Sequence, residues 1–184
     1  MHDKSLSKFL SLVLRHKPES IGLELDPNGW APLDLLIQKM REHGRKVDLS
    51  AIQHVVEHND KQRFSLDMHR RRIRANQGHS IAVDLELPPA EPPMLLYHGT
   101  AAKNTGLIAA KGLVKGRRQH VHLSADIETA TRVGGRHGQP IVLTIHAKDM
   151  HDAGYTFFIS ANGVWLTDHV PVEFIAFESP NAPA

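Results

Sequence analysis

The chain has 184 residues and a formal net charge of +2, with 41% hydrophobic and 23% charged side chains. This composition is typical of a globular protein and excludes a largely disordered one. The sequence contains no cysteine, which excludes disulfide frameworks, thiolate metal sites and cysteine nucleophiles. No apolar run approaches the ~18 residues that cross a bilayer, and no secretory signal pattern opens the chain, so we expect a soluble cytoplasmic protein without a membrane partner.

Basic side chains are concentrated in the first part of the chain. Residues 1–80 carry 14 Lys and Arg against 10 Asp and Glu, whereas residues 81–184 carry 8 against 10. The densest cluster is formed by Arg70, Arg71, Arg72 and Arg74. Such a cluster can contact a polyanion such as nucleic acid, although a solvated basic surface is the more common explanation.

The first lobe predicts helices followed by a hairpin. Apolar residues recur at helical spacing over 6–14 and again over 33–43, and a third helix is expected after Asp48 as its N-cap. Residues 63–66 and 73–75 then predict two short strands around an arginine-rich turn. This order of elements is typical of a winged-helix module, which commonly binds nucleic acid.

A proline-rich stretch separates this lobe from a second one. Residues 88–93 contain four of the 11 prolines, which disfavours a helix and favours an extended linker. We therefore predict a first lobe over 1–87 and a second lobe over 94–184. Short apolar segments and two helical patterns, near 104–110 and 126–132, indicate that the second lobe is β-rich and of the α+β class. Its predicted strands lie near 95–97, 121–123, 141–145, 157–159 and 174–177.

Some polar residues suggest chemistry. Arg15 and His16 pair a permanent cation with a titratable imidazole, which suits phosphate binding, although the dipole at a helix C-terminus attracts the same residues. The second lobe lacks the glycine motif of a Rossmann fold and the Walker sequence. It instead has polar residues at or near strand ends, where ligand sites are common. These are His98 and Thr100, His122 and Ser124, and Arg136 in a glycine-rich loop.

Six segments, taken together in their order along the chain, form a pattern that none of them shows alone. They are Leu14-Arg15-His16-Lys17-Pro18, Lys61-Gln62-Arg63-Phe64, Ile73 to Ser80, Tyr97-His98-Gly99-Thr100, Val121-His122-Leu123-Ser124, and Val133 to Gly138. This series resembles the RNA 2′-phosphotransferase family, also called the tRNA 2′-phosphotransferases. The resemblance extends over about residues 3 to 180, and six motifs in the family's order make a chance match improbable.

The resemblance implies a winged-helix-like RNA-binding lobe and a β-rich NAD-binding lobe of the ADP-ribosyltransferase type, with the active site in the cleft between them. It implies removal of an internal RNA 2′-phosphate with NAD as co-substrate, through an ADP-ribosylated RNA 2′-phosphate. The products would be nicotinamide and ADP-ribose 1″,2″-cyclic phosphate. The implied partner is RNA that bears a 2′-phosphate, with spliced tRNA as one candidate, and we expect a monomer.

The resemblance also assigns the site residues. The family's Arg-His-Arg-Arg tetrad falls on Arg15, His16, Arg63 and Arg136, with Arg132 as the alternative for the last position. The residues expected to bind NAD are His98, Gly99, Thr100, Gly112, Leu113, His122 and Ser124. Many ADP-ribosyltransferases have a late glutamate, and here an apolar residue within 167–173 takes the corresponding place. The absence of this glutamate fits a nucleophile that is already ionised when it binds.

Three other interpretations of the sequence compete with this one. An ADP-ribosyltransferase that modifies terminal phosphates of nucleic acid would keep both the NAD and the phosphate contacts, and only the acceptor separates it from the family reaction. A non-catalytic nucleic-acid-binding protein would leave the second lobe unexplained. A metal site could use His54 with His58 or His120 with His122, but a set of four tetrahedral ligands with a carboxylate partner is not evident, and 14 histidines produce such spacings by accident, so we expect no metal.

Overall fold

The computed structural model describes residues 3–177, and the chain divides after Glu86 into an N-terminal and a C-terminal unit. Each unit combines short helices with small antiparallel sheets, so the fold is α+β, as predicted. Residues 178–184 of the predicted second lobe lie outside the described residues. Within residues 3–177, none of the helices has both the length and the apolar character needed to cross a bilayer.

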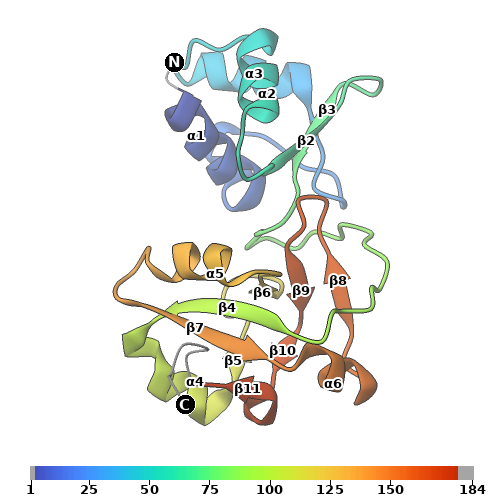
Figure 1. The fold of residues 1–184 in the computed structure, drawn as a ribbon. Helices are drawn as coiled ribbons and strands as arrows, with labels where there is room; N and C mark the ends of the chain where they lie inside the picture. The colour runs from blue at the N-terminus through green and yellow to red at the C-terminus, as the bar shows by residue number, and fades with distance from the viewer. Residues whose placement is uncertain (1–2, 178–184) are drawn as a thin grey trace. The chain divides into compact units, whose positions relative to one another are not determined.

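Helices form the first part of the N-terminal unit (Figure 1). They are α1 (Asp3–Arg15), the 3-10 turn η1 (Pro18–Ile21), α2 (Leu33–Glu42) and α3 (Leu49–Glu57). The three predicted helices are confirmed, and the Asp48 carboxylate accepts a hydrogen bond from the Ala51 amide at 2.8 Å, which caps α3. The core is aliphatic because Leu6, Leu10 and Leu14 form one apolar stripe on α1 that is at most 1% exposed.

A three-stranded antiparallel sheet completes this unit. Its strands are β1 (Ala31–Pro32), β3 (Arg72–Ala75) and β2 (Phe64–Asp67), in that spatial order. The predicted hairpin of β2 and β3 is confirmed. The short β1 was not predicted, because two residues are too few to show a strand period. On β3, Ile73 and Ala75 are buried, so Arg72 and Arg74 project from the opposite face.

The C-terminal unit contains three small antiparallel sheets, ordered β11-β7-β4, β6-β9-β8 and β10-β5. In chain order its elements are β4 (Leu96–Ala101), η2 (Ala102–Asn104), α4 (Thr105–Lys111), β5 (Leu113–Val114), β6 (Val121–Leu123), α5 (Ile127–Gly134), β7 (Pro140–Ile145), α6 (Ala147–Asp152), β8 (Phe157–Ile159), β9 (Trp165–Thr167), β10 (His169–Val170), η3 (Val172–Phe174) and β11 (Ile175–Ala176). All five predicted strands and both predicted helices are present, although the last strand is shorter than predicted. The sequence reasoning missed α6, β5, β9 and β10.

The proline-rich stretch pairs with the C-terminal unit. Pro89 forms an isolated bridge with Phe158, and the Ala90 amide donates to the Phe157 carbonyl at 2.8 Å. No helix occurs in residues 88–93. These contacts explain why the chain divides just before this stretch, after Glu86, and not within it.

Helix α5 packs against strand β4 at a separation that requires glycine (Figure 1). A Cβ atom added at Gly99 would overlap the carbonyl group of Ala130. A Cβ atom at Gly134 would lie 2.8 Å from the carbonyl oxygen of Thr100, which is also too close. Because backbone meets backbone here, no side-chain movement can relieve the overlap. Gly99, predicted as an NAD contact, therefore has a packing role in this unit.

Replacing Gly99 with alanine should destabilise the protein, because the added methyl group forces α5 away from β4. We expect the free energy of unfolding, measured by urea denaturation, to fall by about 3 kcal/mol. Gly106→Ala is the matched control, since a Cβ atom at this position in α4 meets nothing within 4 Å. Its free energy of unfolding should be unchanged or up to ~1 kcal/mol higher. Equal stability of the two variants would contradict the packing explanation.

Candidate active site

The segment 76–80 continues strand β3 and runs back against the end of helix α1. The Ser80 amide donates to the Arg15 carbonyl at 2.9 Å, and the Ser80 hydroxyl lies 2.8 Å from Nδ1 of His16. Gly78 faces the Arg15 guanidinium, whose Cζ would be only 3.4 Å from a Cβ atom at that position. The segment thereby holds the predicted arginine and histidine in place from one side.

Arg63 is positioned by two buried asparagines. Its Nη1 donates to Oδ1 of Asn59 at 3.2 Å, and the side-chain amide nitrogen of Asn59 donates to Ser7 Oγ at 3.0 Å. Asn76 donates through its backbone amide to the Arg63 carbonyl at 2.8 Å and through its side chain to the Gln62 carbonyl at 2.6 Å. Gln62 has a φ of 45°, in the left-handed region, so these bonds stabilise a strained turn next to Arg63. Segment 76–80 therefore contacts three of the four predicted tetrad residues.

His79 is buried among positive charges in the same segment. It is 1% exposed, and neither ring nitrogen has a hydrogen-bond partner within residues 3–177. Burial, and then the charges of Arg15, His16 and Arg74, lower the pKa of His79 to about 4. The imidazole is therefore neutral near pH 7, which limits repulsion in a region that already favours an anion.

A cavity of about 500 Å³ lies beside Arg63, between residues of α1 and α3. Its charged lining is mostly basic, with Asp3 and Asp60 as the carboxylates among the lining residues. The cationic side chains are Lys4, Lys8, Lys61 and Arg63. This excess of positive charge favours a phosphate-bearing ligand near Arg63.

In the C-terminal unit, two of the predicted NAD-binding residues lie side by side. Nδ1 of His98 on β4 is 3.0 Å from the carbonyl oxygen of His122 on β6, so the ring donates through Nδ1. Burial lowers the pKa of His98, this hydrogen bond raises it in part, and the charge of Arg118 lowers it again. Nη1 of Arg118 is 2.9 Å from Nδ1 of His122. A guanidinium can only donate, so the His122 ring accepts through Nδ1.

Arg118 is the residue that the sequence reasoning missed. Burial, and then the charge of Arg136, lower the pKa of Arg118, so two guanidinium groups lie near each other. Arg132 is instead on the surface of α5, where it pairs with Glu128 at 3.1 Å and is 59% exposed. This geometry favours Arg136 over Arg132 and adds Arg118 as a second candidate. In the sequence, the only indication of a role for Arg118 is its position four residues before His122.

The other predicted NAD contacts are more enclosed. Thr100 is 8% exposed, and Leu113 is 4% exposed within the apolar core, so Leu113 can offer only its backbone. Gly112 has a φ of 73°, and a Cβ atom there would overlap the carbonyl group of Val170. Ser124 is half-buried and pairs through its backbone with Tyr97 on β4. Thr100 and Ser124 each lie two positions along the chain from one of the two histidines, whereas Gly112 and Leu113 lie against β10.

The histidine pairs that suggested a metal make other contacts. His54 and His58 stack with their ring centroids 4.2 Å apart, and Nε2 of His54 is 3.2 Å from an Asp3 carboxylate oxygen. His120 packs edge-on against Phe158. Within the described part of the chain, no group of three or more His, Cys, Asp or Glu side chains is arranged to hold a metal ion.

Acid should destabilise the protein through His79. Its pKa is about 4 in the folded protein and near 6.5 in the unfolded chain, so the neutral form is favoured by folding. This contribution is complete above about pH 6.5 and is lost as the pH falls toward about 4. At about pH 5 the free energy of unfolding should have dropped by ~2 kcal/mol from this group.

Urea denaturation at neutral and acidic pH tests this expectation. The His79→Gln variant should show a shallower pH dependence than the natural protein, whereas His54→Gln, at an exposed position on α3, should keep the original one. If the free energy of unfolding of His79→Gln keeps the pH dependence of the natural protein, another group, such as His98, is responsible.

Comparison with known proteins gives a consistent result. A sequence profile described as RNA 2′-phosphotransferase, Tpt1/KptA family, matches residues 1–169. A Hahella chejuensis protein named "Probable RNA 2′-phosphotransferase" is 54% identical over 173 residues, covering 94% of this chain and 93% of the relative. Proteins of the same name from Flavobacterium johnsoniae and Pseudomonas aeruginosa are 52% and 55% identical, covering 96% and 92% of this chain and 97% and 93% of theirs.

Proposed function

This chain belongs to the RNA 2′-phosphotransferase family, and we propose that it removes an internal 2′-phosphate from RNA with NAD as co-substrate. The observation that carries this proposal is the gathering of Arg15, His16 and Arg63 along segment 76–80. Two arginines and a histidine along one short segment provide the charged hydrogen-bond donors that a phosphate dianion accepts, and few purely structural roles need all three.

The proposed roles follow the two units. Three helices followed by a hairpin support a winged-helix-like RNA-binding lobe over 1–87. The paired histidines and the cation pair of Arg118 and Arg136 support an NAD-binding lobe of the ADP-ribosyltransferase type over 94–184. Spliced tRNA as the substrate, the monomeric state and the cytoplasmic location stay predictions.

The side chains fit a two-step reaction. In the first step, an oxygen of the 2′-phosphate forms a bond to C1″ of the nicotinamide-bearing ribose as the bond to nicotinamide breaks. NAD supplies the acceptor ribose and the leaving group. The phosphate is already ionised, so Arg15 and Arg63 have to orient it and need not remove a proton. This explains how the reaction can run without a general base at this step.

In the second step, the ribose 2″-hydroxyl attacks phosphorus and loses its proton to solvent, and the RNA 2′-oxygen leaves, which closes the cyclic phosphate. Negative charge on the non-bridging oxygens is stabilised by the guanidinium groups. His16 is assigned to donate a proton to the departing 2′-oxygen, with its ring oriented by the Ser80 hydroxyl at Nδ1. The last tetrad position stays a prediction for Arg136 in the C-terminal unit, with Arg118 as a second candidate.

Two RNA substrates test the proposal and its alternative. Purified protein is incubated with NAD and an oligonucleotide that carries an internal 2′-phosphate, and in parallel with one that carries a terminal phosphate. We expect the first to be converted to the 2′-hydroxyl form with release of nicotinamide and ADP-ribose cyclic phosphate. Stable ADP-ribosylation of the terminal phosphate, with the 2′-phosphate untouched, would favour the alternative transferase.

Variants of the arginines should separate catalytic from surface residues. Arg63→Ala should lower kcat by roughly 100-fold or more, because it removes a donor that stabilises transition-state charge. The remaining tetrad residue is whichever of Arg118→Ala and Arg136→Ala shows the larger loss of kcat, and we expect it to be Arg118 because its guanidinium donates to the ring of His122 at 2.9 Å. Arg132→Ala is the control, since this side chain forms an exposed ion pair. Full activity of Arg63→Ala would remove Arg63 from the site.

A further inference from the structure

The hairpin β2–β3 presents a row of cations on the face that turns away from the aliphatic core. Arg72 and Arg74 project from this face of β3. The register places Ser65 directly opposite Arg74, and two positions further along the ladder the Asn76 amide donates to the Arg63 carbonyl at 2.8 Å. Directly opposed residues project to the same side of a sheet, so Arg63 shares this face with Arg74.

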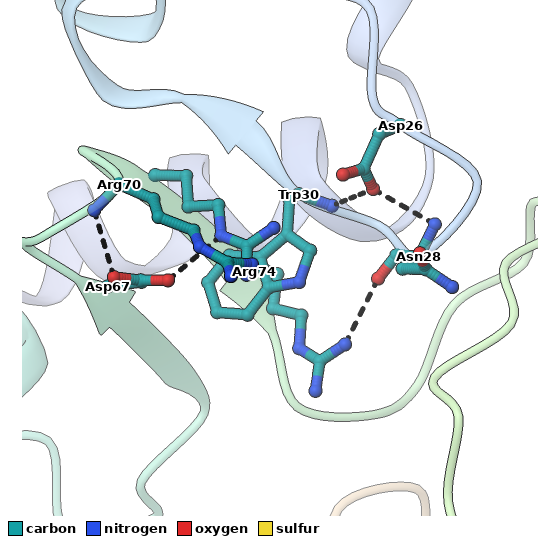
Figure 2. Close-up of polar contacts among 7 residues, drawn as sticks. Asp26, Asn28, Trp30, Asp67, Arg70 and Arg74 are labelled. Carbon is teal, nitrogen blue, oxygen red and sulfur yellow. Dashed lines mark hydrogen bonds and ion pairs between the residues drawn. The ribbon is translucent and has the colours of Figure 1, made fainter.

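An indole ring packs against the two guanidinium groups of this row. Figure 2 shows one of them, Arg74, with Trp30. The Cζ atoms of Arg72 and Arg74 lie 4.3 and 4.6 Å from the centroid of the Trp30 ring. The Trp30 backbone is held in turn, since its amide donates to the Asp26 carboxylate at 2.9 Å. Trp30 therefore holds two cations close together on a stable turn.

The arginines of this hairpin differ in how their charge is neutralised. Arg71 forms a bidentate pair with Asp34 at 2.9 and 2.6 Å, and Arg72 donates to Asp67 at 3.0 Å. Arg74 forms no ion pair with any residue in 3–177. Unlike Arg71 and Arg72, Arg74 therefore keeps a charge that a ligand can neutralise.

The environment of Arg74 favours an anion. Its Nη1 makes a long hydrogen bond, 3.3 Å, to the Asn28 carbonyl, and its buried Nε has no hydrogen-bond partner within the described residues. Burial, and then the charge of Arg72, lower the pKa of Arg74, while Glu86 and Asp26 oppose this from a distance. A buried donor without an acceptor is costly, and a phosphate oxygen would satisfy it.

We propose that Arg74, supported by Trp30 and Arg72, binds a backbone phosphate of the RNA strand beside the 2′-phosphorylated nucleotide. The inference rests on the proposed function, because it takes Arg63 as the contact to the 2′-phosphate. An internal nucleotide has backbone phosphates on both sides, so a strand held at Arg63 can pass Arg74 along the same face. A guanidinium fork matches the geometry of a phosphate, and phosphate contacts position an RNA without reading its sequence.

Binding of two ligands at several salt concentrations tests the proposal. One is a fluorescent oligonucleotide with nucleotides on both sides of an internal 2′-phosphate, and the other is a nucleoside 2′-phosphate with no flanking strand. In Arg74→Met, which keeps an unbranched stem on Trp30, affinity for the oligonucleotide should fall roughly tenfold. The slope of log affinity against log salt should become shallower by about 0.7. Affinity for the nucleoside 2′-phosphate and the KM for NAD should stay unchanged.

Two further variants control for charge and for folding. Arg71→Met removes the same charge from the same hairpin at a residue already paired with Asp34, so its salt slope should equal that of the natural protein. Arg74→Lys should restore the slope while recovering only part of the affinity, because it keeps the charge and loses the fork. Thermal unfolding of each variant checks that the hairpin is intact.

The outcomes separate this inference from the proposed function. An unchanged slope in Arg74→Met, or an equal change in Arg71→Met, would overturn the role of Arg74 even if the natural protein removes the 2′-phosphate. An equal loss of affinity for both ligands would do the same, because it would place Arg74 at the 2′-phosphate itself. The binding measurement needs no turnover, so it still decides the matter if the 2′-phosphate is not removed.

Discussion

Like charges held close together are the constraint on which the N-terminal unit depends. Arg15, His16 and Arg74 all act on His79, whose pKa is lowered to about 4 by burial and then by the charges of these three neighbours. The fold offsets this cost with an aliphatic core around α1 and with hydrogen bonds from segment 76–80. An anionic substrate relieves the same repulsion when it binds. The repulsion that opposes folding therefore also favours binding of the anion.

Backbone contact plays the corresponding part in the C-terminal unit. Gly99 and Gly134 allow α5 to lie directly on β4, and the loop with Arg136 begins where α5 ends. On the neighbouring strand, His122 accepts from Arg118 and offers its carbonyl to His98. Small residues thus set the distance between elements, and the cations occupy the loops at their ends. This arrangement keeps charged side chains out of the apolar core.

The elements that could be predicted are those with a long or well-marked pattern. Helix α1 was predicted because its leucines repeat at helical spacing, and α3 because Asp48 caps it. Strands β5 and β10 contain two residues each, which is too short to show alternation. Among the site residues, Arg118 was missed because it lies in a loop, where no periodicity marks a functional side chain.

The sequence by itself determined the order of the longer elements, the α+β class, and the residue types that suit a phosphate and a dinucleotide, because these follow from local periodicity and from motif order. Only the tertiary structure decided which of those residues touch. His16 meets Ser80, 64 positions further along the chain, and Arg74 lies on Trp30 because β3 pairs with β1 next to that residue. Such contacts depend on strand register and on helix packing, which are long-range properties that no local pattern encodes.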